Sequence, residues 1–350
     1  MVDRRVVDPR ALYRRHRPGT VMRMWVRTEA STRIGLGHFM RCFAIAEEAC
    51  HHEIEVVFLL NEAPNAAIAR LQTIGAKWRW METRIGSPED IVAIKTVVPK
   101  GDVLLLDSYA FDADSYDRLS ADYYLAVMDD LADVRQLKAH LIVNAAGSAV
   151  DLAYVDIAPE ATLCLGPDYA QIRREFRRHY PAPRRPHIAV MFGGSDPKGL
   201  TATCAEALLE SAPAMDIRLI VGPANANVDA LRQLCAERAG LKLYLSPDNV
   251  AEVLTGAELV VTAAGGSVGE IAAMNLAALV MVVVDNQVAA LTSSPFPVLD
   301  ARDGWPADFA LTIEALMGDA DMRREIAARA HGLIDGKGCE RIIKAIRSHG

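Results

Sequence analysis

The stretch Ile188-Ala189-Val190-Met191-Phe192-Gly193-Gly194-Ser195-Asp196-Pro197 joins a continuous apolar run to a glycine-rich loop. An apolar run of this length that ends at turn residues predicts a buried β-strand. A strand that is apolar on both faces is typical of a parallel sheet covered by helices on both sides. This stretch therefore predicts a strand, a loop and the start of a helix within an α/β domain.

The same alternation of apolar strands and helices continues in both directions from this stretch. Toward the C-terminus the predicted strands are Ile217–Val221, Leu259–Thr262 and Ala278–Val284. Toward the N-terminus they are Met24–Thr28, Val56–Leu60, Val103–Leu106, Tyr124–Met128 and Leu141–Val143. Helices are predicted at Gly37–Cys50, Ala66–Ile74 and within Ala307–Ser348. The predicted fold class is α/β, with two doubly wound, Rossmann-like domains.

The chain has 350 residues, which is too long for one ordinary core and predicts two domains. The segment Arg177–Pro186 is rich in proline and charge, and we take it as the linker. We expect an N-terminal domain over residues 22–178 and a C-terminal domain over 179–350, with the last helix a candidate to return to the first domain. Residues 1–21 are expected to be an unstructured basic arm, or to precede the true start of the chain.

Composition and charge exclude several classes of protein. The formal net charge of −7 argues against a nucleic-acid partner, which would require a basic excess. The longest apolar stretch, Leu276–Val284, is far shorter than the roughly 20 residues of a membrane span, and no secretory signal is visible. No His, Asp or Glu cluster shows metal-ligand spacing, and no C-x-x-C pair occurs among the six cysteines: Cys42, Cys50, Cys164, Cys204, Cys235 and Cys339. We expect a cytoplasmic protein with reduced thiols and no metal or cofactor, a monomer or a weak dimer.

Polar residues follow three predicted strands of the first domain. Gly35-Leu36-Gly37-His38 lies at the start of a helix, where the helix dipole disfavours imidazolium and a neutral imidazole is suited to act as a general base. Asp107-Ser108-Tyr109 follows the predicted strand Val103–Leu106, and Asp129-Asp130 follows the predicted strand Tyr124–Met128. The carboxylates are candidates to orient His38 or to accept sugar hydroxyls. The structural alternatives are a helix-capping histidine, aspartates that cap helices, and a tyrosine that packs on the sheet.

The second domain has its own glycine-rich strand ends. Gly193-Gly194-Ser195-Asp196 suits a diphosphate held by backbone amides. Gly265-Gly266-Ser267 is a second candidate phosphate loop, and Glu270 lies one turn further on, where it can accept bonds from ribose hydroxyls. Asn286-Gln287 offers amides at the next strand end. The alternative for Glu270 is a first-turn acid that complements the helix dipole. Because ligands bind beyond the carboxyl ends of parallel strands, these loops would converge in a cleft if the two sheets face each other.

These blocks, in this order, resemble the UDP-sugar hydrolase family of pseudaminic acid biosynthesis, over roughly residues 24–290. Seven residues fit the family's opening segment Arg-x-Asp-x-Ser-x-x-Ile-Gly-x-Gly-His-x-x-Arg: Arg27, Ser31, Ile34, Gly35, Gly37, His38 and Arg41. The Asp-x-Tyr, Asp-Asp, Gly-Gly-Ser-Asp and Asn-Gln blocks also fit, as does the segment Tyr169–Phe176, whose Arg173 is a candidate to meet phosphate or to pair with Glu175. The chain departs from the family at Glu29, at Asp285 and at Asn275–Ala278, and the change at Glu29 lies on the sugar side of the expected cleft.

The resemblance implies two Rossmann-like domains of the glycosyltransferase-B type, with UDP on the second. It also implies metal-independent attack of water at the anomeric carbon, which removes UDP from an amino-deoxy sugar. The expected catalytic residues are His38 and Tyr109. The expected sugar-binding residues are Gly37, Arg41, Asp107, Asp130, Asn286 and Gln287, and the expected nucleotide-binding residues are Gly194, Ser195, Val250, Gly265, Gly266, Ser267 and Glu270. The alternatives are a glycosyltransferase of the same fold, a hydrolysing 2-epimerase, and a non-catalytic nucleotide-sugar-binding protein.

Overall fold

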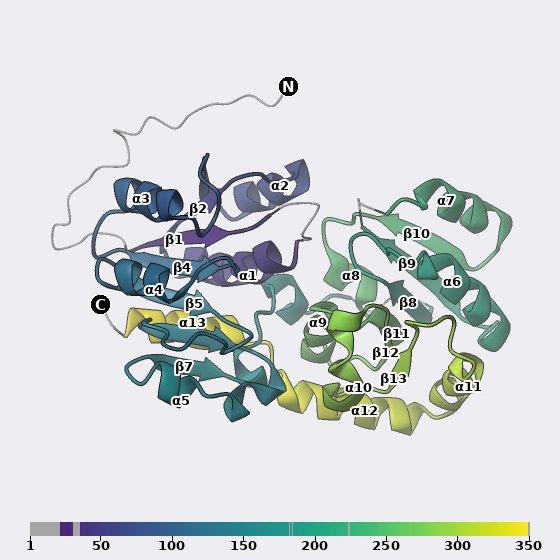
Figure 1. Ribbon diagram of the computed structural model, residues 1–350. Coiled ribbons are helices and arrows are strands. Elements are labelled where there is room, and N and C mark those ends of the chain that lie inside the picture. Colours follow the sequence, from purple (N-terminus) through teal and green to yellow (C-terminus); the bar gives the residue numbers. More distant parts are fainter. Residues whose placement is uncertain (1–21, 31–35, 182, 184, 223–224, 349–350) are drawn as a thin grey trace. The chain divides into compact units, whose positions relative to one another are not determined.

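The computed structural model describes residues 22–30, 36–181, 183, 185–222 and 225–348 (Figure 1). The expected basic arm and the motif residues Ser31, Ile34 and Gly35 lie outside the described residues. The chain divides into two compact units. Unit 1 contains residues 1–171 and 338–350, and unit 2 contains residues 172–337.

Unit 1 is built on a seven-stranded parallel sheet in the order β3-β2-β1-β4-β5-β6-β7. The strands are β1 Arg23–Thr28, β2 Glu55–Leu60, β3 Lys77–Trp80, β4 Val103–Asp107, β5 Tyr124–Met128, β6 Leu141–Asn144 and β7 Thr162–Leu165. The helices are α1 Gly37–His51, α2 Asn65–Thr73, α3 Pro88–Val97, α4 Ala113–Ser120, α5 Tyr154–Ile157 and α13 Gly338–Arg347. Short 3₁₀ turns cover Gly147–Asp151 and Pro167–Tyr169.

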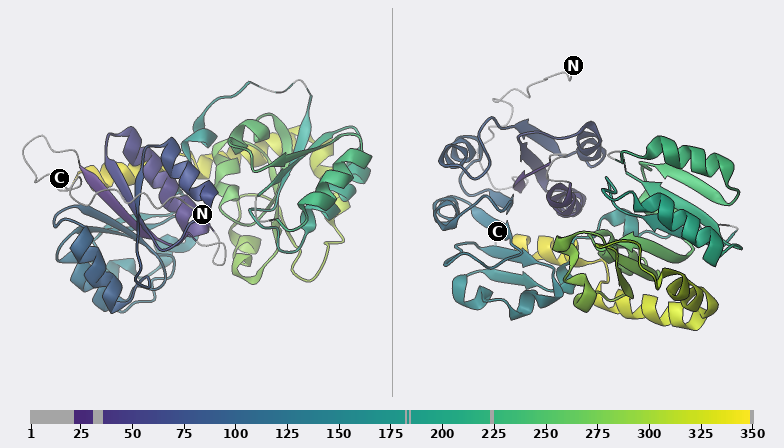
Figure 2. Two further views of the ribbon diagram at one scale, coloured as in Figure 1. Left: turned by 90° about the horizontal axis from the view of Figure 1, so that it is seen from above. Right: turned by 45° about the vertical axis from the view of Figure 1, so that its right-hand side comes forward.

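Two apolar cores cover the two faces of the unit 1 sheet. One contains residues of α1, α2 and α13, and the other contains residues of α3, α4 and α5. The last helix of the chain, α13, packs against α1 in the first core, and its yellow ribbon lies among the purple and blue elements of unit 1 in Figure 2. Burial on both faces explains why the central strands are apolar throughout.

Unit 2 repeats this plan with a six-stranded parallel sheet in the order β10-β9-β8-β11-β12-β13. The strands are β8 His187–Met191, β9 Asp216–Val221, β10 Leu241–Leu245, β11 Ala257–Ala263, β12 Ala278–Val282 and β13 Val298–Asp300. The helices are α6 Leu200–Ser211, α7 Val228–Glu237, α8 Val250–Leu254, α9 Ser267–Ala273, α10 Ala290–Ser293, α11 Phe309–Gly318 and α12 Ala320–Leu333, and 3₁₀ turns cover Arg174–Arg177 and Asp285–Gln287.

Both sheets have a point at which the strand order reverses. In unit 1 this switch point lies between β1 and β4, and in unit 2 it lies between β8 and β11. In parallel α/β sheets the ligand crevice forms outside the carboxyl ends of the strands at such a point. The segments after these four strands contain Gly37-His38, Asp107-Ser108-Tyr109, Gly193-Gly194-Ser195 and Gly265-Gly266-Ser267, whereas Asp129-Asp130 and Gln287 follow the adjacent strands β5 and β12.

The division between the units differs from the expected linker Arg177–Pro186. The break lies between Gln171 and Ile172, and residues 172–186 belong to unit 2. Ile172 and Phe176 are buried, and the Ile172 side chain lies against Gly269 of α9. The charged segment Tyr169–Phe176 thus forms short 3₁₀ turns with a buried side, and it is not an α-helix.

Candidate active site

The centre of the unit 1 site is a pair formed by His38 and Asp107. His38 lies in the first turn of α1, directly after β1, and Asp107 is the last residue of β4. The two strands are neighbours, so His38 Nδ1 lies 2.7 Å from Asp107 Oδ1 although the residues are 69 positions apart. The carboxylate accepts the Nδ1 proton, which leaves Nε2 as the basic nitrogen of the neutral ring. No described residue forms a hydrogen bond with Nε2.

The carboxylate that orients His38 is Asp107, and not Asp129, Asp130 or Glu29. Its hydrogen bond raises the pKa of His38, although burial and the Arg41 charge act in the opposite direction. The helix dipole alone predicted the opposite shift, toward a neutral ring. The Asp107 contact outweighs the dipole because a charge in direct contact acts more strongly than the partial charge of a helix end.

Arg41 joins the ends of two strands. Its Nε donates to Asp107 Oδ2 at 2.6 Å, and its Nη1 donates to both oxygens of Asp130 at 2.9 and 2.8 Å. Burial lowers the pKa of Arg41, but the two carboxylates more than offset this and raise it. The guanidinium is thus held by two acids of its own unit, and it acts as a fixed brace between β4 and β5.

Tyr109 lies at the edge of this network. Its ring meets the His38 ring edge-on at 5.0 Å between centroids, and its hydroxyl donates to Asp130 Oδ2 at 2.7 Å. Burial and then the Asp130 carboxylate raise the pKa of Tyr109 to about 12. The phenol is therefore protonated near neutral pH, so it serves as a hydrogen-bond donor rather than as a base. The residue is 60% exposed, and Gly37 is also exposed, which leaves this side of His38 open.

Two contacts that the sequence did not assign support this network. Cys42, one turn beyond His38, donates its thiol to Asp107 Oδ2 at 3.4 Å. The neighbouring Asp129 does not join Arg41 but accepts a hydrogen bond from Tyr154. Neither contact leaves a signal in local sequence periodicity, because each partner comes from a different element.

In unit 2 the loop after β8 is shaped by close backbone packing. Gly194 and Ser195 are exposed in this loop, and Gly193 has a φ of +77°. A Cβ on Gly222, at the end of β9, would lie 2.4 Å from the Gly194 Cα, so only glycine fits there. Asp196 is buried and accepts bonds from the Leu200 and Thr201 amides at 2.9 Å, so it caps α6.

A pocket of about 240 Å³ lies beside the loop after β11. Its lining includes Gly265 and Gln287 from the expected site, and the full set is Ala264, Gly265, Val268, Gln287, Ala289, Ala290, Ser293, Ser294 and Pro295. Gln287 Oε1 accepts the Val283 amide at 2.9 Å, which leaves its amide nitrogen as the group that can donate. The side chain of Asn286 lies outside the described part of the chain. The pocket thus presents uncharged residues, most of them small, from the segments that follow β11 and β12.

Glu270 and Arg173 form a largely buried ion pair in unit 2. Arg173 Nε and Nη2 lie 2.9 and 2.8 Å from Glu270 Oε1, and the same guanidinium pairs with Glu175 and lies over the Phe176 ring at 4.6 Å. Of the two roles considered for Arg173, the structure shows the pairing with Glu175 and adds Glu270. The expected ligands Gly266 and Ser267 begin α9 on the turn before Glu270, and Val250 begins α8 beyond β10.

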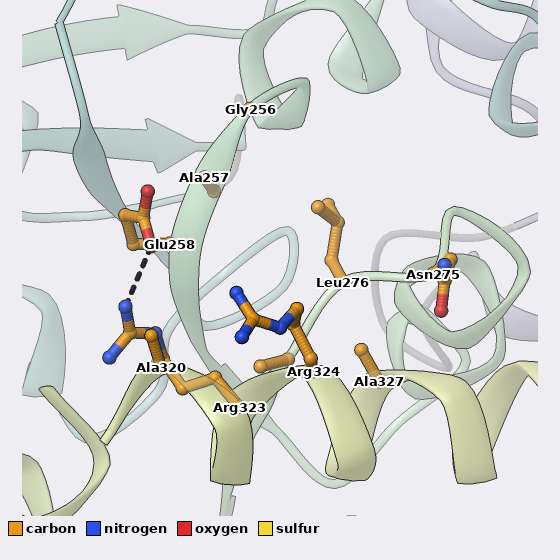
Figure 3. Close-up of a pocket in the computed structure, with 10 residues that line it drawn as sticks. Gly256, Ala257, Glu258, Asn275, Leu276, Ala320, Arg323, Arg324 and Ala327 are labelled. Carbon is orange, nitrogen blue, oxygen red and sulfur yellow. Dashed lines mark hydrogen bonds and ion pairs between the residues drawn. The ribbon is translucent and has the colours of Figure 1, made fainter.

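A further pocket, of about 220 Å³, lies at the amino-terminal ends of strands in the unit 2 sheet, on the side away from the glycine loops (Figure 3). It is bounded by the amino-terminal ends of β11 and β12 and by α12, and Arg323 Nη2 forms an ion pair with Glu258 there at 2.8 Å. None of the expected site residues lines it. Within the described residues there is also no group of three His, Cys, Asp or Glu side chains placed to hold a metal ion. The helices described here include none with the length and apolar character of a membrane span.

Comparison with known proteins identifies the fold. No protein-family model matches the chain. The uncharacterized protein MJ1062 of Methanocaldococcus jannaschii is 25% identical over 281 residues, which is 76% of this chain and 56% of that protein; the chain thus spans about half the length of this relative. The MnaA–UDP structure from S. aureus aligns with 94% of this chain and 97% of its own, with a TM-score of 0.66 and 12% identity. A glycosyltransferase from Rickettsia africae aligns with 94% and 98% of the two chains, with a TM-score of 0.60 and 10% identity.

The chain has a glycosyltransferase-B-like fold. Two parallel-sheet α/β domains of Rossmann type, as predicted from the apolar strands, are confirmed by the sheets and by these alignments. At 10–12% identity the likeness establishes the fold alone.

Proposed function

We propose that this protein binds a UDP-activated sugar and hydrolyses it to UDP and the free sugar. The observation that carries this proposal is the His38–Asp107 pair at the β1/β4 switch point, with Nε2 of His38 open to a ligand. A histidine oriented by a buried carboxylate is the arrangement required to remove a proton from water. The resemblance of the sequence blocks to pseudaminic-type UDP-sugar hydrolases supports an amino-deoxy sugar as the substrate.

The reaction proposed is direct attack of water on the anomeric carbon. The water oxygen bonds to C1 as His38 Nε2 takes its proton, and the bond from C1 to the β-phosphate oxygen breaks, so that UDP leaves with that electron pair. A single displacement inverts the anomeric centre. Asp107 stabilises the imidazolium that forms, and the Tyr109 hydroxyl and Asp130 carboxylate are suited to position sugar hydroxyls.

We assign the nucleotide to unit 2. The exposed loop at Gly194 and Ser195 follows β8, and the pocket beside Gly265 lies at the ends of the neighbouring strands β11 and β12. Backbone amides at such strand ends can bind a diphosphate. Glu270 is assigned to the ribose hydroxyls, with its carboxylate fixed by Arg173. The structure of MnaA, which shares the fold, contains UDP, and this supports UDP as the nucleotide. Neither unit is assigned a metal, so we expect turnover to persist in EDTA.

The test is a panel of UDP-sugars offered without any acceptor. We expect release of UDP and free sugar, with ¹⁸O from labelled water at C1 of the sugar and none in UDP. Replacement of His38 by alanine is expected to lower kcat by about 10² to 10⁴, with little change in UDP affinity. Release of UDP only when an acceptor is added would favour a glycosyltransferase, a function supported by the shared fold of the Rickettsia enzyme. Label in the phosphate would contradict the role given to His38.

A further inference from the structure

Tyr154 forms a buried polar cluster behind the unit 1 site. It begins α5 and is fully buried, and its hydroxyl donates to Asp129 Oδ2 at 2.7 Å. The same hydroxyl accepts from Asn144 Nδ2, at the end of β6, at 2.9 Å. Asn144 and Asp129 are also buried. Each group has its partner, so the cluster fixes the position of Asp129, because a buried polar group that loses its partner is costly.

Asp129 in turn shapes the loop that follows β5. Its Oδ2 also accepts the Ala132 amide at 2.9 Å, and Ala132 has a φ of +50°. This is the left-handed region, which alanine adopts only when surrounding contacts enforce it. The Asp129 carboxylate stabilises the turn at Ala132 through this hydrogen bond, and the Tyr154 hydroxyl holds the carboxylate in position.

We propose that Tyr154 is a positioning residue for the unit 1 site. Asp130 lies inside the loop that Tyr154 anchors, and its carboxylate binds Arg41 Nη1 and the Tyr109 hydroxyl. A shift of this loop would move the Asp130 carboxylate away from both of these partners. Tyr154 touches neither of them and acts only through the loop. Its effect on catalysis rests on the proposed function, whereas its effect on Tyr109 does not.

The test compares Tyr154→Phe with Tyr123→Phe. Tyr123 is a matched control, because it is buried in the same core and its hydroxyl donates to the Val98 carbonyl at 3.2 Å, away from the site. Both variants lose one buried hydroxyl, and we expect the larger loss in the urea midpoint for Tyr154→Phe, whose hydroxyl bonds to a carboxylate and an amide rather than to one carbonyl. The pKa of Tyr109, measured by ¹³C NMR of labelled tyrosine, is expected to fall below its parent value in Tyr154→Phe alone, because the part of the upward shift that comes from the Asp130 carboxylate is lost while the part from burial remains.

Catalysis provides the second readout. In Tyr154→Phe we expect kcat on the active UDP-sugar to fall about 10- to 100-fold, the scale of a small misplacement of active-site groups, while Tyr123→Phe retains the parent rate. Asn144→Ala, which leaves the bond from Tyr154 to Asp129 in place, is expected to cause a smaller fall. An unchanged Tyr109 pKa in a folded Tyr154→Phe protein would overturn the proposal. If no UDP-sugar is hydrolysed by the parent protein, the proposed function fails, and the NMR titration still decides the role of Tyr154.

Discussion

Replacement of Asp107 by asparagine tests the centre of the proposed mechanism. The carboxylate is fully buried and accepts from His38 Nδ1 at 2.7 Å and from Arg41 at 2.6 and 2.5 Å. An asparagine side chain replaces one of the two carboxylate oxygens with an NH₂ group. Because both oxygens accept hydrogen bonds, this NH₂ group would face a donor whichever oxygen it replaces. His38 is the one partner that can respond by becoming an acceptor at Nδ1. Its proton would then sit on Nε2, and the ring could not take a proton from water.

The expected size of the effect follows from these contacts. General base catalysis contributes about 10² to 10⁴ in rate, or about 3–5 kcal/mol in the barrier, and we expect kcat to fall by that order. Breaking the partly buried pair with Arg41 is expected to lower the free energy of unfolding by about 3 kcal/mol. UDP affinity should be unchanged, because Asp107 belongs to unit 1 and the nucleotide is assigned to unit 2.

The pH profile gives a second and independent signature. Asp107 raises the pKa of His38, so the imidazolium persists to higher pH and the base form is available only above the raised value. In the parent protein we therefore expect the acid limb of kcat/KM above pH 6.5, with activity lost as pH falls through it. In Asp107→Asn the remaining activity should show its acid limb at lower pH, because the charge that favours the imidazolium is gone.

Asp102→Asn is the matched control. Asp102 is also buried, lies at the amino-terminal end of the same strand β4, and accepts from Trp25 Nε1 at 2.8 Å. We expect this variant to lose stability but to keep the parent rate and pH profile. The reasoning would be refuted if Asp107→Asn kept the parent kcat and the parent acid limb.

Three further outcomes are expected. Glu270→Ala should weaken UDP binding by about 1–3 kcal/mol in calorimetry. Glu258→Ala, at the amino-terminal end of β11, should leave UDP binding unchanged. If Glu270→Ala binds UDP as tightly as the parent protein does, Glu270 does not bind the ribose. His187 is fully buried and burial lowers its pKa to about 4, so the unfolded chain binds the extra proton first. As pH falls from about 6.5 to about 4, the free energy of unfolding of the parent, measured with urea, should fall by about 3 kcal/mol more than that of His187→Phe. The prediction would be wrong if the free energies of unfolding of the two proteins changed with pH in parallel. Gly222→Ala should weaken UDP binding at least about tenfold through overpacking, whereas Gly318→Ala, with open space around it, should bind as the parent does.

Much of the architecture was predictable because the signals for it are local. Central strands are buried on both faces, so each appears as an apolar run in the sequence. The strands that the sequence did not reveal are β3, β7, β10 and β13, and these are the four edges of the two sheets. Polar residues interrupt the apolar run in edge strands, as in Lys77–Trp80, where Lys77 and Arg79 alternate with tryptophans. Glycine loops were also predictable, since backbone conformation and close approach depend on residue type at one position.

The chemistry of the site was decided by tertiary structure. Local patterns place His38 after one strand and Asp107, Asp129 and Asp130 after others. The order of the strands in the sheet leaves no local pattern in the sequence. Because β1 pairs with β4, Asp107 reaches His38, and Asp129 turns toward Tyr154 instead. Contacts between residues far apart in the chain depend on which elements become neighbours, and only the folded sheet fixes that.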